Sequence, residues 1–259
     1  MRLDSTRLAA ALVGGFVTAL TMLSIAEAGL WVSEKEIERR YRVEWLTMKK
    51  HVPIVQDQRN NRYVLCVAND VIKTLDAQYQ DLNWEVIVFD DPAKNAQVMP
   101  GGKVAIYSGI LDVADTPDAL AAVIGHEAAH LTQGHVMERE RRAAQSEALT
   151  MIGNAATGLG GMVSDATMLA FMLPFTRDQE TEADAVGMHS MAKAGYDPRA
   201  TFYLWKAMSA SEEGARPAEF ASTHPAPDTR MADLVPHLTQ ALTEYNQARE
   251  AGIRPHCGT

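Results

Sequence analysis

The pattern of apolar and polar residues predicts helices at the start of the chain and a short extended region after them. Residues 30–48 repeat apolar side chains on one stripe of an amphipathic helix, with Ser33 as its expected N-cap. A second helix is expected over residues 62–79. Residues 84–89, Trp-Glu-Val-Ile-Val-Phe, have the β-branched and aromatic content of a strand.

Two further extended runs are separated by a turn at residues 100–102, Pro-Gly-Gly. The second of these runs contains Val104, Ala105 and Ile106. A small mixed sheet is therefore expected directly before residues 116–135.

The remainder of the chain is predicted to be helical. Thr116 is the expected N-cap of one helix, and Gly134 is expected to end it. Residues 148–175 are apolar but are interrupted too often by polar residues and glycine to span a membrane. A pair of helices is expected there, packed in the core or, alternatively, lying over a cleft as a lid. Further helices are expected at residues 177–195 and 231–251.

The predicted fold is α+β, mainly helical, with a small sheet beside the helix at residues 116–135. The chain has 259 residues, 47% of them hydrophobic, which suits a single domain over residues 29–259. The net charge is -9, and basic tracts are absent from the sequence. Nucleic acid is therefore not expected as a partner.

Residues 1–28 have the pattern of a secretory signal. Positive charge at Arg2 and Arg7 precedes an uncharged run, and residues 26–28, Ala-Glu-Ala, form a small-x-small cleavage site. An uncleaved anchor with membrane association is the alternative, and cleavage is favoured because the run is only mildly hydrophobic. Either way the body of the protein is expected to be exported, into the periplasm if the source is bacterial.

Residues 126–130 read His-Glu-Ala-Ala-His inside the helix expected at residues 116–135. Helical residues four apart share a face, so His126 and His130 can offer two imidazole nitrogens to one metal ion. Glu127 lies beside them, where it can act as a general base on a water without ligating the metal. An ordinary buried helix would also tolerate these residues, so a third ligand is required.

Glu180 and Asp184 provide candidates, because they also lie four apart on one face of a predicted helix. One carboxylate can bind the metal while the other holds a ligating histidine through its far ring nitrogen. Glu182 points elsewhere around this helix. His135 follows His130 by five residues, a spacing that excludes the metzincin pattern.

Four segments in order resemble a zinc metallopeptidase family, the one that includes HtpX-like proteases, the Oma-type mitochondrial protease and type I CAAX prenyl proteases. They are Asn-Ala-x-x-x-Pro-Gly-Gly from residue 95, His-Glu-Ala-Ala-His, the run 176–187 and Thr-His-Pro-Ala-Pro-Asp-Thr-Arg from residue 223. The match runs from about residue 95 to 234. The resemblance implies a gluzincin-type fold.

The resemblance also implies roles for particular residues. One Zn²⁺ per chain would be held by His126, His130 and Glu180, with Glu127 as the base and Asp184 behind a histidine ligand. His224 and Arg230 fall on the family element near the substrate carbonyl. His224 would donate to the oxyanion, or would occupy the fourth zinc position and keep the enzyme latent. Gln97 replaces the aromatic residue usual after Asn95 and Ala96, which puts the binding of substrate side chains in doubt.

The sequence thus predicts an exported zinc metalloendopeptidase that acts on misfolded or misassembled proteins. Asn95 and the run 103–108, which includes Val104, Ala105 and Ile106, are expected to bind substrate, the run as an exposed edge strand that takes protein chains as an added strand. The alternative is a chaperone-like or scaffold protein that binds unfolded chains and keeps zinc for structure. Cys66 and Cys257 are the only cysteines and are expected to form a disulfide, with two buried free thiols as the alternative.

Overall fold

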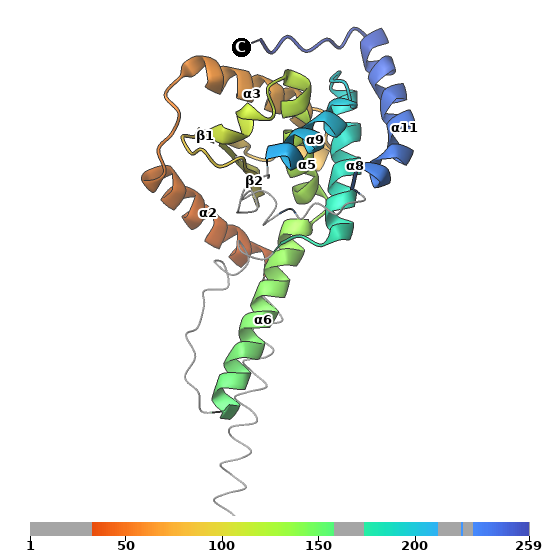
Figure 1. The fold of residues 1–259 in the computed structure, drawn as a ribbon. Helices are drawn as coiled ribbons and strands as arrows, with labels where there is room; N and C mark the ends of the chain where they lie inside the picture. The colour runs from red at the N-terminus through yellow and green to blue at the C-terminus, as the bar shows by residue number, and fades with distance from the viewer. Residues whose placement is uncertain (1–32, 158–173, 212–223, 225–229, 259) are drawn as a thin grey trace, which may run out of the picture.

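The structure is a computed structural model that describes residues 33–157, 174–211, 224 and 230–258 (Figure 1). The helices are α2 (Glu34–His51), α3 (Gln58–Ile72), α4 (Ala77–Gln80), α5 (Pro117–Thr132), α6 (His135–Thr157), α8 (Arg177–Lys193), α9 (Ala200–Ser211) and α11 (Arg230–Glu250). The strands are β1 (Glu85–Phe89), β2 (Ala96–Met99) and β3 (Lys103–Tyr107), and the 3-10 helix η1 (Ser108–Asp112) follows them. The described part is α+β and mainly helical, as predicted.

Polar side chains cap the starts of several helices. Ser33 and Thr116 each accept a hydrogen bond from a backbone amide in the first turn of the helix that follows, as expected from the sequence. Pro117 occupies the first turn of α5. Thr176 and Gln179 form a reciprocal capping box at the start of α8. These caps fix where α5 and α8 begin.

The sheet has the strand order β1-β3-β2. β1 runs parallel to β3, and β2 runs antiparallel to β3 with Ala96 opposite Ile106. The prediction that the run 103–108 is an exposed edge strand is therefore wrong, because β3 is the central strand and pairs on both sides. Val104, Ala105 and Ile106 are buried in the core.

The two outer strands, β1 and β2, contact different parts of the chain. The outer edge of β1 is partly covered, because Ile54 forms a bridge with Phe89 and the Val55 amide donates to the Val88 carbonyl. β2 lies next to α5. The edge strand beside the helix with the two histidines is thus β2.

Helix α5 lies inside the molecule and packs against α3, α8, α9 and β2 (Figure 1). Its closest approach is to α8, where Gly125 faces Gly187. A Cβ atom added at Gly125 would lie 2.7 Å from the Gly187 carbonyl oxygen, which is closer than a carbon atom can approach. Glycine at both positions therefore lets the two helix backbones touch.

Gly134 separates α5 from α6 and has a positive φ of 75°, which glycine adopts without strain. α6 then runs out beyond the body of the molecule (Figure 1). Residues 148–157 continue this helix, whereas residues 158–173, the rest of the predicted helix pair, lie outside the described residues. Residues 1–28 also lie outside them. Among the helices that the structure describes, none combines the length and hydrophobicity needed to cross a membrane.

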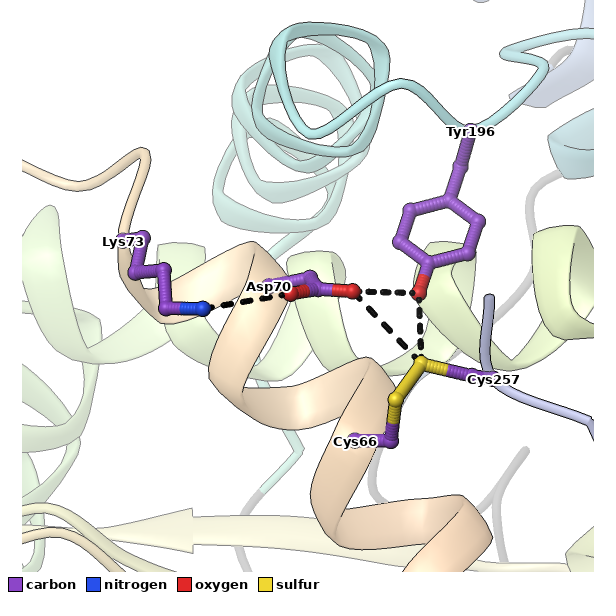
Figure 2. The surroundings of a disulfide bond; sticks show 5 residues. All are labelled: Cys66, Asp70, Lys73, Tyr196 and Cys257. Atoms are coloured by element: carbon purple, nitrogen blue, oxygen red, sulfur yellow. Dashed lines mark hydrogen bonds and ion pairs between the residues drawn. A yellow bond between two sulfur atoms is a disulfide. The ribbon is translucent and has the colours of Figure 1, made fainter. Parts of the chain in front are cut away.

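Cys66 on α3 and Cys257 in the C-terminal tail form the predicted disulfide, with Cα atoms 5.6 Å apart (Figure 2). The bond joins residues 191 positions apart in the sequence. Tyr196, which follows α8, donates from its hydroxyl to Asp70 Oδ2 at 3.2 Å and contacts the sulfur of Cys257 at 3.4 Å. The tail is therefore fixed to α3 and to the end of α8.

Candidate metal centre

Helix α5 presents two imidazole rings to one point. His126 and His130 are one turn apart, and both side chains are buried. Their Nε2 atoms lie 3.0 Å from each other. The sequence spacing therefore produces the paired nitrogens that were predicted from it.

Helix α8 supplies a carboxylate to the same point. Glu180 is fully buried, with Oε1 3.4 Å from His130 Nε2 and Oε2 3.5 Å from His126 Nε2. The close contact of Gly125 with Gly187 brings α8 near enough for this. Of the two candidate carboxylates, Glu180 is thus the one that reaches the histidine pair directly.

His224 supplies a fourth donor atom. Its Nδ1 lies 3.2 Å from His126 Nε2 and 3.0 Å from Glu180 Oε1. The donor atoms of His126, His130, Glu180 and His224 all lie within 4.8 Å of one another. The structure therefore brings together all three predicted ligands and the predicted fourth residue.

The spacing of these atoms tests whether a metal ion fits. Zinc bound by nitrogen and oxygen at about 2.0–2.1 Å in a tetrahedron has neighbouring ligand atoms about 3.4 Å apart. The closest separations in the cluster run from 3.0 to 3.5 Å. Lone pairs held this close repel one another unless a proton or a metal ion lies between them. The donor set and its spacing fit one zinc ion.

Asp184 and Arg230 contact His126 and Glu180 and hold these side chains in position. Asp184 Oδ1 lies 2.8 Å from His126 Nδ1, so this ring donates from Nδ1 and keeps the lone pair of Nε2 for the metal. Arg230 donates from Nη2 to Asp184 Oδ1 at 2.8 Å and pairs with Glu180 Oε2 at 2.9 Å. Its guanidinium also stacks on Trp205, 3.5 Å from the ring centroid. These contacts indicate that Arg230 orients the residues of the site.

The two carboxylate oxygens of Glu127 have different surroundings. Oε2 accepts a hydrogen bond from the backbone amide of Val98 on β2 at 3.0 Å. Oε1 is buried without a hydrogen-bond partner in the described residues and lies 3.6 Å from His224 Nε2. One oxygen is therefore anchored to the edge strand, and the other faces the donor cluster with a free lone pair.

Burial and charge set the protonation of these groups. Burial raises the pKa of Glu127, and nearby histidines offset part of this effect. Burial also disfavours ionised Glu180, yet His224 and His130 hold its pKa well below the ordinary value. Burial lowers the pKa of His130 well below its ordinary value, which favours the neutral ring that a zinc ligand needs. For His126, burial acts in the same direction, but Asp184 outweighs it and raises the pKa.

The predicted substrate-binding residues lie in two different environments. Val104, Ala105 and Ile106 belong to the central strand and are away from any open edge. Asn95 is buried before β2, and its side-chain oxygen accepts from the Ala96 amide at 2.9 Å. Asn95 thus stays a candidate at the start of the edge strand β2, whereas the three β3 residues do not.

The sequence interpretation missed two contacts of His130. Its Nδ1 lies 3.0 Å from Nδ1 of His135, and Phe175 stacks on its ring with a centroid distance of 3.8 Å. His135 in turn contacts Glu182, which lies outside the donor cluster, as expected. The repeated histidine one residue after Gly134 was the available signal. Phe175 gave no signal in the sequence.

Comparison with known proteins gives a family match and several relatives. The model of Peptidase family M48 matches residues 58–237. Mitochondrial metalloendopeptidase OMA1 of Schizosaccharomyces pombe is 38% identical over 163 residues, 62% of this chain and 48% of that protein. OMA1 of Saccharomyces cerevisiae is 32% identical over 200 residues, 70% of this chain and 58% of that protein.

A bacterial relative is the beta-barrel assembly-enhancing protease of Yersinia pestis, 28% identical over 219 residues, 76% of this chain and 44% of that protein. This chain spans about half the length of these curated relatives. The family match covers α3, the sheet, α5 and α8, and it also takes in His224 and Arg230. The sequence resemblance is thereby confirmed, and the chain belongs to peptidase family M48.

Proposed function

We propose that this protein is a zinc-dependent metalloendopeptidase that hydrolyses peptide bonds in misfolded or misassembled exported proteins. The observation that carries the proposal is the position of Glu127, with one oxygen anchored and the other free beside the donor cluster. The names of the relatives, metalloendopeptidase and protease, support the same activity.

The residues divide the chemistry as follows. When bound, zinc supplies a Lewis acid that polarises the scissile carbonyl and makes an attacking water more acidic. Glu127 Oε1 takes the proton of that water and returns it to the leaving amine. The Val98 amide keeps Oε2 in place, so the carboxylate does not rotate away. Asp184 and Arg230 hold His126 and Glu180 in position throughout.

The outer edge of β2, which pairs with no further strand among the described residues, is the better candidate for binding protein substrates as an added strand. The Val98 amide is directed at Glu127 and not at β3, so this side of β2 faces the catalytic carboxylate. A substrate paired along β2 would place its backbone beside Glu127 without regard to sequence. Peptides with a methylated backbone nitrogen at the paired position should therefore show a raised KM, while the same methyl group outside the paired segment should have little effect.

Export is proposed from two features. Residues 1–28 carry the signal-like pattern, with membrane anchoring as the alternative. The disulfide between Cys66 and Cys257 suits an oxidising compartment.

The alternative function, zinc kept for structure in a chaperone-like or scaffold protein, has one observation in its favour. His224 completes a set of four protein donors, and structural zinc sites are closed by four protein ligands. A purely structural site, however, gives no reason for a buried carboxylate with a free oxygen at its side. We propose instead that His224 is a displaceable fourth ligand that keeps the resting enzyme latent.

The test compares the wild-type protein with Glu127→Gln for zinc content and for hydrolysis of a casein-like substrate. Glu127→Gln should keep one zinc per chain and lose activity by about 100-fold or more, because the amide cannot take a proton. Glu38→Gln, an exposed change of the same kind on α2, is the control and should match the wild type. Equal hydrolysis by Glu127→Gln and the wild type would show that Glu127 is not the base.

A further inference from the structure

Within the described residues, Nδ1 of His130 contacts another ring, whereas Nδ1 of His126 contacts a carboxylate. His126 Nδ1 is held by Asp184 Oδ1 at 2.8 Å. At His130 Nδ1, the hydrogen-bond partner among the described residues is the ring of His135, at 3.0 Å. The two zinc-binding rings of α5 are therefore oriented by different means.

His135 is the first residue of α6, directly after the turn at Gly134. Its side chain is buried, and both of its ring nitrogens are occupied. Nδ1 faces His130, and Nε2 lies 3.1 Å from Glu182 Oε2 on α8. The three side chains thus form a line from the donor cluster to the surface, where the side chain of Glu182 is 54% exposed.

Only one arrangement of the protons on the rings of His130 and His135 leaves His130 able to bind a metal ion. His130 must direct the lone pair of Nε2 at the cluster, so its proton is on Nδ1 and is donated to His135. His135 Nδ1 must then accept, which leaves the proton of His135 on Nε2, where it is donated to the Glu182 carboxylate. The opposite order would place a hydrogen on His130 Nε2, where it would occupy the lone pair that a metal ion needs and form a hydrogen bond to His126 Nε2 at 3.0 Å instead.

We propose that His135 is a positioning residue for zinc binding, which fixes the ring and tautomer of His130, and that Glu182 fixes His135 in turn. The inference rests on the proposed function only in taking zinc as the bound metal. It assigns a role to the repeated histidine after the His-Glu-Ala-Ala-His motif. It also gives α6 a part in the site, because α6 begins at the residue that holds a ligand.

The first test measures the zinc dissociation constant of the full chain by competition with a chelator, so that it does not depend on proteolysis. His135→Leu introduces an apolar side chain of similar size that cannot accept a hydrogen bond from His130. It should weaken zinc binding by about 10–100-fold, the usual effect of losing such a partner. His135→Gln retains an acceptor oxygen and a donor nitrogen, so it should recover most of the affinity. The Co²⁺-substituted His135→Leu protein should have an altered visible spectrum.

His189→Leu is the matched control, because His189 forms a similar pair with Glu244 at 2.7 Å without touching a ligand. It should leave zinc binding unchanged. Folded His135→Leu with wild-type affinity would overturn the proposal. Equal losses for His135→Leu and His135→Gln would overturn it too, because they would indicate a packing effect.

A second variant, at the exposed residue Glu182, tests the proposal even if His135→Leu does not fold. Glu182→Ala should weaken zinc binding by less than His135→Leu, since water can accept from His135 Nε2 in place of the half-exposed carboxylate. Asp178→Ala, an exposed acidic residue on the same helix, is its control and should have no effect. The same zinc affinity in both alanine variants would remove Glu182 from the line and contradict the proposal.

Discussion

At the scale of single residues, the surroundings of Glu127 set the pKa of its carboxyl group. Burial is the largest influence on this carboxyl and raises its pKa above the ordinary value of 4.5. A base must be deprotonated to take a proton, so activity falls as pH drops through the raised pKa. The acid limb of kcat/KM should therefore lie above pH 4.5, with the zinc content measured at each pH. A limb below that value in zinc-loaded enzyme would contradict the assignment.

His224 allows a prediction whose sign separates two mechanisms. Its Nδ1 lies among the zinc donors, and its Nε2 is 3.6 Å from the free oxygen of Glu127. Removing it should open the fourth position and free the base, so His224→Ala should raise the rate of casein hydrolysis while His126, His130 and Glu180 keep the zinc. His256→Ala, in the exposed tail, is the control. A fall of about 100-fold would instead identify His224 as an oxyanion donor.

Site residues could be predicted from the sequence where they lie on one helix, because helical spacing then decides which side chains share a face. The positions of His126, Glu127 and His130 follow from the geometry of a single helix. Glu180 and Asp184 could be paired but not told apart, because the choice depends on how α8 crosses α5. The contact of His135 with His130 also escaped prediction, since the turn at Gly134 decides it and helical spacing does not.

At the scale of elements, the site depends on the crossing of α5 and α8. Gly187→Ala would place a Cβ 2.7 Å from the backbone of Gly125 and His126, so the helices must separate. Separation would draw Glu180 away from His126 and His130. We therefore expect weaker zinc binding and a lower Tm, although alanine favours an isolated helix by about 1 kcal/mol relative to glycine.

The control for this change is Gly258→Ala, where an added Cβ would meet nothing within 4 Å. Zinc titration and thermal unfolding of both variants make the comparison. A Gly187→Ala protein with unchanged zinc affinity and a higher Tm would show that helix propensity dominates and that the close crossing is not needed.

The sheet shows where sequence patterns at this scale are insufficient. The residue content of β1 and the Pro-Gly-Gly turn between β2 and β3 predicted extended segments correctly. The apolar character of Val104, Ala105 and Ile106 was compatible with an edge or a central strand. Strand order is set by pairing between segments distant in sequence, and β1 with β3 is such a pair. The residues of one strand do not by themselves show which other strands pair with it.

At the scale of the whole molecule, the disulfide between Cys66 and Cys257 ties the C-terminal tail to α3. It closes a loop of 191 positions, and the chain-entropy model gives about 5 kcal/mol as an upper bound for a loop this long. Cys66 lies on α3, which packs against α5, so the bond also ties the tail to the helix that bears His126 and His130. The tail contributes few buried side chains of its own, which leaves the covalent bond as its main attachment.

Breaking this bond should therefore lower stability more than it lowers zinc affinity in the folded state. The double variant Cys66→Ala/Cys257→Ala should unfold at lower denaturant concentration than the wild type, by less than the upper bound, while its zinc dissociation constant stays close to that of the wild type. A mild reductant should shift the unfolding midpoint of the wild type toward that of the double variant. The double variant is itself the control, because the reductant has no disulfide to act on and should not move its midpoint. Mass spectrometry of the unreduced wild type showing two free thiols, or equal midpoints for the two proteins, would mean that the disulfide does not stabilise the fold.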